Sequence, residues 1–198
     1  MSNETIIGHL KTRDRLIASI DVSSKQDVER LCYEINNEIS TLKIGLEVIY
    51  SCGFEIIKTI KSFGYKVMLD AKLHDIPNTV GKAAAAIARL GVSMLTVHAS
   101  GGKEMLLTAK DKILNESFKQ KFLPPLIFAV TVLTSLDNKD LKQIGFAEGY
   151  DKTVLKMASI IRECQINGIV CSPKEAPIIR KEFGKNLYIA TPGIRLNN

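Results

Sequence analysis

The sequence predicts an α/β fold of the TIM (β/α)₈ barrel type, with the eighth strand–helix unit absent from the chain as given. Short apolar segments rich in Val, Ile and Leu alternate with longer amphipathic segments along the chain, as in a parallel sheet wrapped by helices. Seven strand segments in one chain of this size favour a barrel over an open doubly wound sheet. No G-x-G-x-x-G motif follows the first strand segment, so a dinucleotide-binding sheet is not indicated.

The strand segments are each four to six residues long, as expected of strands that are buried on both faces. In chain order they span residues 16–21, 42–45, 66–70, 94–98, 126–131, 168–171 and 187–190. The given sequence stops soon after the seventh segment, whereas a complete barrel of this type takes about 250 residues. We therefore expect a barrel that is truncated at its C-terminus.

The helical segments between the strands are bounded by residues that favour helix ends. Ser24 precedes the first helical segment, Gly64 follows the second, and Pro77 and Gly91 bound the third. In chain order these segments span residues 25–39, 46–63, 77–90, 102–114, 150–165 and 173–183. Six helices between seven strands give the repeated strand–helix unit of a barrel.

Length and composition indicate one globular domain over residues 1–198, with 45% apolar and 24% charged residues. Lys and Arg number 27 against 21 Asp and Glu, but these charges are dispersed and no basic run is interleaved with aromatics, so no nucleic-acid partner is expected. No apolar stretch reaches the roughly 18–20 residues that span a bilayer, and the N-terminus lacks the apolar core of a signal peptide. We expect a cytoplasmic protein with no membrane partner. The four cysteines lack zinc-site spacing and are predicted to be reduced thiols.

Four charged side chains are expected to meet at the carboxyl ends of the first three strand segments. The first segment ends at Asp21, the second carries Lys43 near its end, and the third ends at Asp70 with Lys72 just beyond. Side chains alternate along a strand, so Asp70 and Lys72 point the same way, with backbone positions about 6–7 Å apart. Barrel active sites lie at this end of the strands. The cluster is therefore a candidate active site, with a structural ion-pair network at the rim as the alternative.

The cluster indicates acid–base chemistry rather than metal chemistry. A lysine held between carboxylates stays protonated and can act as a general acid. The carboxylates could instead hold a metal ion, but two lysines compete with a divalent cation for the same oxygens. We therefore expect no metal ion at this site.

Residues 70–79 read Asp-Ala-Lys-Leu-His-Asp-Ile-Pro-Asn-Thr, and this pattern, with Asp21 and Lys43, resembles the orotidine 5′-phosphate decarboxylase family. Residues 131–135 (Thr-Val-Leu-Thr-Ser), 168–173 and 191–195 (Thr-Pro-Gly-Ile-Arg) resemble the same family in the same order. The resemblance implies a cofactor-free carboxy-lyase that converts orotidine 5′-phosphate to UMP and CO₂, the last step of de novo UMP biosynthesis. It also implies a homodimer.

The same resemblance implies a role for each matching residue. Lys72 is the proton donor to C6 of the pyrimidine, Asp70 lies against the substrate carboxylate, and Lys43 binds the ribose and holds Asp70. Asp75 completes the catalytic set. The further substrate-binding residues are Asp21 at the ribose hydroxyls, Asp75, Ile76 and Thr79 lent across the dimer interface, Thr134 at the pyrimidine, and Arg195.

Two other functions stay open at this point. Mg²⁺-dependent sugar-phosphate lyases of the same superfamily share the Asp-x-Lys-x-x-Asp segment, but they typically carry an acidic residue where Lys43 stands. The second alternative is an inactive, ligand-binding remnant. The family continues beyond the segment at 191–195 with a phosphate-contacting Gln and an eighth strand that ends in a Gly-Arg pair, which the given sequence does not include. A barrel ending at Asn198 is expected to be poorly soluble and to lose most of its activity.

Overall fold

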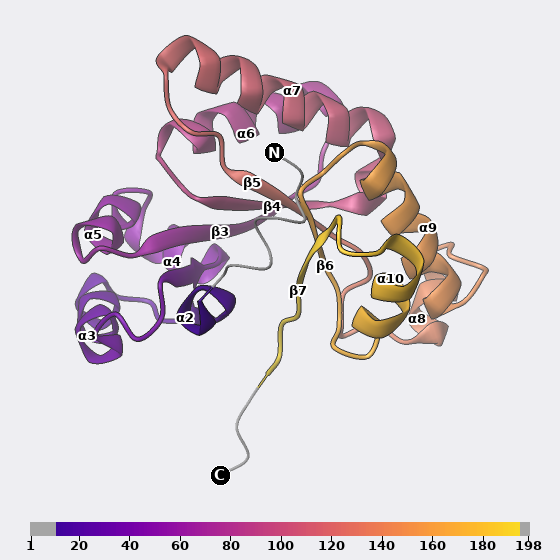
Figure 1. Ribbon diagram of the computed structural model, residues 1–198, viewed down its shortest axis with the longest axis horizontal. Coiled ribbons are helices and arrows are strands. Elements are labelled where there is room, and N and C mark those ends of the chain that lie inside the picture. The colour runs from indigo at the N-terminus through magenta and orange to yellow at the C-terminus, as the bar shows by residue number, and fades with distance from the viewer. Residues whose placement is uncertain (1–10, 195–198) are drawn as a thin grey trace.

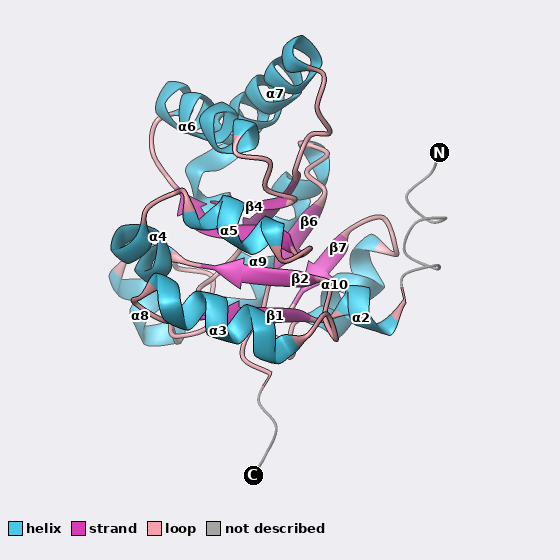
Figure 2. Cartoon of the chain, turned by 90° about the vertical axis from the view of Figure 1, so that its left-hand side faces the viewer, coloured by secondary structure: helices cyan, strands magenta, loops and turns pink. Residues whose placement is uncertain are grey.

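The computed structural model describes residues 11–194, in which seven parallel strands form one sheet in chain order. The sheet is curled into a half-barrel, and within the described residues β1 and β7 are its two edges (Figure 2). The strands are β1 (Ile17–Ile20), β2 (Thr41–Ile44), β3 (Lys66–Leu73), β4 (Met94–His98), β5 (Leu126–Val130), β6 (Gly168–Val170) and β7 (Tyr188–Ala190). The predicted α/β fold of barrel type is confirmed, and each of the seven predicted strand segments contains or overlaps a strand.

The helices lie outside the strands and surround the sheet on several sides (Figure 1). They are α2 (Thr12–Arg15), α3 (Lys25–Ile35), α4 (Leu46–Cys52), α5 (Ile56–Ser62), α6 (Pro77–Arg89), η1 (Ala99–Gly101), α7 (Gly102–Gln120), α8 (Asn138–Gln143), α9 (Tyr150–Glu163) and α10 (Ala176–Phe183). Among residues 11–194, no helix is both long and apolar enough to cross a bilayer.

Two predicted helices are interrupted by residues with positive φ. The predicted helix over 25–39 ends at Ile35, because Asn36 and Asn37 adopt the left-handed conformation, which asparagine tolerates better than most residues. The predicted helix over 46–63 is divided into α4 and α5 at Gly53, whose φ of 72° no helical residue adopts.

Other helix boundaries differ because the sequence signals are weak there. α7 continues to Gln120, six residues beyond the predicted end at 114, and stops where Lys121 turns left-handed. α10 begins at Ala176 rather than 173, because the chain first makes a turn closed by the Glu175 N–H donating to the Ser172 carbonyl. α2 and α8 are only four and six residues long, too short for a helical period to be read from the sequence.

The two faces of the curled sheet have different chemistry. Leu42, Ile44, Val67 and Leu69 alternate along β2 and β3 and belong to the buried apolar cluster that also includes helix residues. The residues between them, such as Lys43, point to the opposite, inner face of the curl. The same alternation places Asp70, two residues beyond Met68, on the inner face at the carboxyl ends of the strands. The fold therefore collects polar side chains inside the curl.

Gly168 leaves room for the Phe128 ring on the inner face of the sheet. It pairs in register with Phe128 on one side and Tyr188 on the other, and the two rings approach to 6.3 Å between centroids. A Cβ atom on Gly168 would overlap the Phe128 ring. The glycine is thus required for close packing of β5, β6 and β7 on this face.

Candidate active site

Four charged side chains of alternating sign form a continuous row across β1, β2 and β3. Lys43 Nζ lies 3.9 Å from Asp21 Oδ1 and 3.6 Å from Asp70 Oδ2, and Lys72 Nζ donates to Asp70 Oδ2 at 2.6 Å. Asp70 is central and largely buried, whereas Asp21 at the edge is 64% exposed. The structure therefore brings together the four charges that the strand ends were expected to supply.

Strand register explains why these side chains meet. Ser19, Lys43 and Met68 are register partners in β1, β2 and β3, so their side chains share one level on one face. Asp21 and Asp70 lie two residues beyond Ser19 and Met68, one level closer to the carboxyl ends. The long Lys43 side chain spans that step and reaches both carboxylates, while Ser19 Oγ donates to Asp21 Oδ2 at 2.7 Å.

β3 departs from regular geometry at the catalytic candidates. Leu69 pairs with Leu95 and Leu73 pairs with Val97, so three residues of β3 stand opposite Thr96 alone on β4. Within this bulge Lys72 has a φ of 46°, in the left-handed region. Such a conformation costs a non-glycine residue about 1–3 kcal/mol and is concentrated at functional sites. The bulge brings Lys72 Nζ onto the carboxylate of Asp70, two residues away.

Asp70 is held in its ionised form by its neighbours. Burial alone would raise its pKa, but the hydrogen bond and charge of Lys72, the hydrogen bond from Thr96 and the charge of Lys43 together lower the pKa of Asp70 below its usual value of 3.8. Both carboxylate oxygens are engaged, because Oδ2 accepts from Lys72 and Oδ1 accepts from Thr96 Oγ1 at 2.8 Å. At neutral pH the site therefore presents a fixed negative charge between two ammonium groups.

Thr96 belongs to this site and was missed by the sequence analysis. Its side chain is buried, 1% of the residue being exposed, and it bonds both Asp70 and the backbone N–H of Lys72. One signal was available in the sequence, because Thr96 interrupts the apolar segment 94–98 and shares a strand face with His98. Nothing in the sequence showed that the bulge in β3 would place Lys72 opposite it.

His98 ends β4 beside the charged row, with its ring 5.3 Å from the His74 ring. Burial, with the nearby charges of His74 and Lys72, lowers the pKa of His98 below its usual value of 6.5. His98 is therefore mainly neutral at physiological pH and adds no positive charge to the site.

The predicted dimer-contributed residues lie on the surface between β3 and the first turn of α6. Asp75, Ile76 and Thr79 are all exposed, Ile76 to 65%. Asp75 Oδ1 accepts from the Ile76 N–H at 2.6 Å, a local contact that shapes the loop. The structure thus presents an apolar side chain and a carboxylate outward from the strand ends.

Thr134 lies exposed in the loop between β5 and α8, beyond the carboxyl end of β5. It is on the same side of the sheet ends as the charged row. Arg195 lies outside the described residues.

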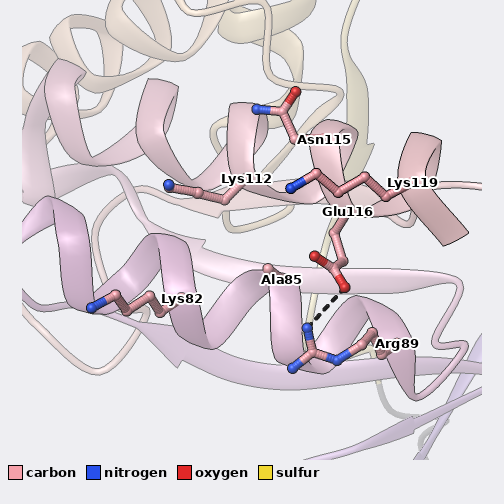
Figure 3. Close-up of a pocket in the computed structure, with 7 residues that line it drawn as sticks. All are labelled: Lys82, Ala85, Arg89, Lys112, Asn115, Glu116 and Lys119. Carbon is pink, nitrogen blue, oxygen red and sulfur yellow. Dashed lines mark hydrogen bonds and ion pairs between the residues drawn. The ribbon is translucent and has the colours of Figure 1, made fainter.

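A separate hollow lies on the outside of the molecule between α6 and α7 (Figure 3). Its one carboxylate, Glu116, pairs with Arg89 at 3.0 Å between Oε1 and Nη1. The hollow is lined by Lys82, Ala85, Arg89, Lys112, Asn115, Glu116 and Lys119. It contains none of the predicted site residues, so the candidate active site is the charged row inside the curl.

The four cysteines are free cysteines, of which Cys32, Cys164 and Cys171 are buried and Cys52 is half-buried. Among residues 11–194, no group of three or more His, Cys, Asp or Glu side chains is arranged to hold a metal ion.

Known proteins similar to this chain are orotidine 5′-phosphate decarboxylases, the family that the residues of the charged row resemble. The family model of the orotidine 5′-phosphate decarboxylase / HUMPS family matches residues 14–198. An orotidine 5′-phosphate decarboxylase of Buchnera aphidicola subsp. Schizaphis graminum is 42% identical over 184 residues, 93% of this chain and 76% of that protein. One of Saccharophagus degradans is 39% identical over 181 residues, 91% of this chain and 74% of that protein.

The fold is likewise similar to a solved structure of this kind. The crystal structure of orotidine 5′-phosphate decarboxylase from Lactobacillus acidophilus matches with a TM-score of 0.84 and 32% identity, over 91% of this chain and 81% of that chain. The seven-stranded half-barrel therefore corresponds to most of a known barrel.

Proposed function

The chain belongs to the orotidine 5′-phosphate decarboxylase family and is a carboxy-lyase that converts orotidine 5′-phosphate to UMP and CO₂; from that premise we propose that it works without a cofactor, with Lys72 as the proton donor. One observation carries the proposal. The Lys72 ammonium group is held 2.6 Å from Asp70 Oδ2 at the carboxyl ends of the strands, where barrel enzymes carry out their chemistry.

The reaction needs stabilisation of negative charge at one carbon atom. When the bond between C6 and the carboxyl group breaks, CO₂ leaves and the electron pair stays on C6. A fixed ammonium at Lys72 stabilises that charge and then transfers a proton to C6, and the neutral lysine amine regains its proton from water. Because the ammonium is already oriented by Asp70, little reorganisation is required during the reaction.

Asp70 and Lys43 prepare the site for this step. Ionised Asp70 repels the substrate carboxylate but not the neutral CO₂ that it becomes, so its charge favours departure of CO₂. Lys43 forms ion pairs with both Asp70 and Asp21, which places it to hold Asp70 and to contact the ribose, while Asp21 binds ribose hydroxyl groups. Thr134 is proposed to contact the pyrimidine, and Arg195 is proposed to bind substrate.

Metal-independent turnover is the expected result that separates this proposal from the sugar-phosphate lyases. Lys43 occupies the place where those enzymes carry an acidic residue, and both Asp70 oxygens already accept hydrogen bonds. We expect the purified protein to consume orotidine 5′-phosphate, followed by absorbance, at the same rate with and without EDTA. UMP should be the product by chromatography. A rate that EDTA abolishes and Mg²⁺ restores would contradict the proposal.

We further propose that two chains form a homodimer in which each lends Asp75, Ile76 and Thr79 to the site of the other. Exposed Ile76 and its neighbouring carboxylate support this arrangement, because an apolar side chain at a strand-end loop is suited to burial against a second copy. The four free thiols support a reducing compartment, and we place the enzyme in the cytoplasm.

Mixing two inactive variants tests the shared site. We expect Lys72→Ala and Asp75→Ala homodimers each to be nearly inactive. In a mixed dimer one site has both substitutions and the other has neither. Random exchange of subunits should therefore restore about a quarter of the wild-type activity in the mixture, and isolated mixed dimers should have about half. The measurement is turnover after co-refolding differently tagged variants, with mixed dimers isolated through both tags. Isolated mixed dimers that remain as inactive as the parents would contradict a site shared between subunits.

A further inference from the structure

We propose that Thr96 is a positioning residue of the decarboxylase site, whose single hydroxyl group fixes Asp70 and the backbone of Lys72 relative to each other. The inference rests on the roles proposed above for these two residues. It concerns the supporting side chain on β4 rather than a group that touches substrate.

The Thr96 hydroxyl group is the donor in one hydrogen bond and the acceptor in another. Thr96 Oγ1 donates to Asp70 Oδ1 at 2.8 Å and accepts from the Lys72 backbone N–H at 2.9 Å. A hydroxyl group has one proton, and an ionised carboxylate is only an acceptor, so the proton must point to Asp70 and a lone pair must face Lys72. The buried hydroxyl therefore acts both as a donor, to Asp70, and as an acceptor, from Lys72.

The position of Thr96 within the sheet explains why a side chain is needed here. Three β3 residues stand opposite this one β4 residue, so the regular backbone ladder is interrupted between the Leu69–Leu95 and Leu73–Val97 pairs. The Lys72 N–H, turned away from regular strand geometry by its φ of 46°, finds its partner in the Thr96 hydroxyl instead. Thr96 thus closes the bulge that places Lys72 beside Asp70.

The consequence concerns the rate of the chemical step more than substrate binding. Without the hydroxyl, Asp70 Oδ1 loses a donor and the Lys72 N–H loses its acceptor in a partly buried place. The Lys72 ammonium then samples positions away from C6, while Lys43 and Asp21 are unchanged. We therefore expect kcat to fall while KM changes little.

Thr96→Val removes the hydroxyl and keeps the shape of the side chain, and Thr96→Ser keeps the hydroxyl. We expect kcat of Thr96→Val to fall by about 10- to 100-fold, the effect of a small misplacement of a reacting group, with KM nearly unchanged. Thr96→Ser should retain most of the wild-type kcat. The matched control is Thr153→Val, which removes another buried hydroxyl. This hydroxyl donates to the carbonyl of Gly149, the residue before α9, and its removal should leave kcat unchanged.

The outcomes separate this inference from the proposed function. If Lys72→Ala is inactive but Thr96→Val has the wild-type kcat, the Thr96 inference is wrong and the role of Lys72 stands. If Lys72→Ala is itself active, the proposed role of Lys72 is wrong. Equal impairment of the Ser and Val variants would show that shape rather than the hydroxyl matters, and would also overturn the inference. Should Thr96→Val fail to fold, Thr96→Ala gives the same kcat and KM test without adding an apolar group beside Asp70.

Discussion

Replacement of Lys72 by alanine is expected to lower kcat for decarboxylation by about a thousandfold or more. In the proposed mechanism, the variant removes both the charge that stabilises the electron pair on C6 and the proton that C6 receives. The Lys72 side chain is 36% exposed, so alanine should not destabilise the fold through lost packing. The measurement is single-turnover and steady-state consumption of orotidine 5′-phosphate, with folding checked by circular dichroism.

Two further substitutions separate the proton from the charge. Lys66→Ala removes an exposed lysine at the other end of β3 and should have the wild-type kcat. Lys72→Arg keeps a positive charge, but a guanidinium group does not release a proton in proteins, so this variant is also expected to be nearly inactive. An arginine variant close to wild type would mean that charge alone suffices and that Lys72 is not the proton donor.

Replacement of Asp70 by asparagine is expected to lower kcat by about a hundredfold or more, since it removes a preorganised charge from the site. The carboxylate orients the Lys72 ammonium at 2.6 Å and is also paired with Lys43. A neutral amide forms no ion pair with Lys72 or Lys43, and it does not repel the substrate carboxylate. Asp111→Asn, an exposed aspartate of α7, is the control and should leave kcat unchanged. A wild-type kcat in Asp70→Asn would contradict the role of this carboxylate.

The same variant should change how stability depends on pH. The pKa of Asp70 is lowered in the folded protein from its usual value of 3.8, so its ionised form stabilises the fold above that value. This contribution is lost as the pH falls through the lowered folded pKa. As the pH falls from about 7 to about 3, the unfolding free energy of the wild type should therefore decrease more than that of Asp70→Asn. Urea unfolding at several pH values measures it, and a difference that stays constant would contradict the ionised, paired state of Asp70.

Much of the fold and the centre of the site could be predicted because they depend on local patterns. Buried parallel strands produce short apolar segments, and charges that follow such segments lie at the carboxyl edge of the sheet. Asp21, Lys43, Asp70 and Lys72 were found in this way, and the structure places them in one row.

The parts that could not be predicted depend on interactions between strands or on single backbone conformations. The bulge opposite Thr96 arises from how β3 pairs with β4, which no pattern within β3 reports. Left-handed Lys72 contradicts the intrinsic preference of lysine, because tertiary contacts hold it there. The helix ends at Asn36 and Gly53 were also not predicted. Both residues can adopt a positive φ, but the sequence does not require them to do so.

Chemical rescue of Lys72→Cys tests the central claim most directly. Alkylation with 2-bromoethylamine converts this cysteine to a near-isosteric lysine analogue that carries an ammonium group. Burial raises the pKa of Cys32 to about 11 and the pKa of Cys171 to about 12, and it also raises the pKa of Cys164. Because the thiolate is the reactive form, these three cysteines should be alkylated slowly. Half-buried Cys52 is controlled by treating the wild-type protein in parallel. We expect a nearly inactive variant that regains decarboxylase activity in proportion to alkylation at position 72, measured by mass spectrometry. Complete alkylation of a folded variant with no gain in activity, or full activity before alkylation, would contradict the assignment of Lys72 as the proton donor.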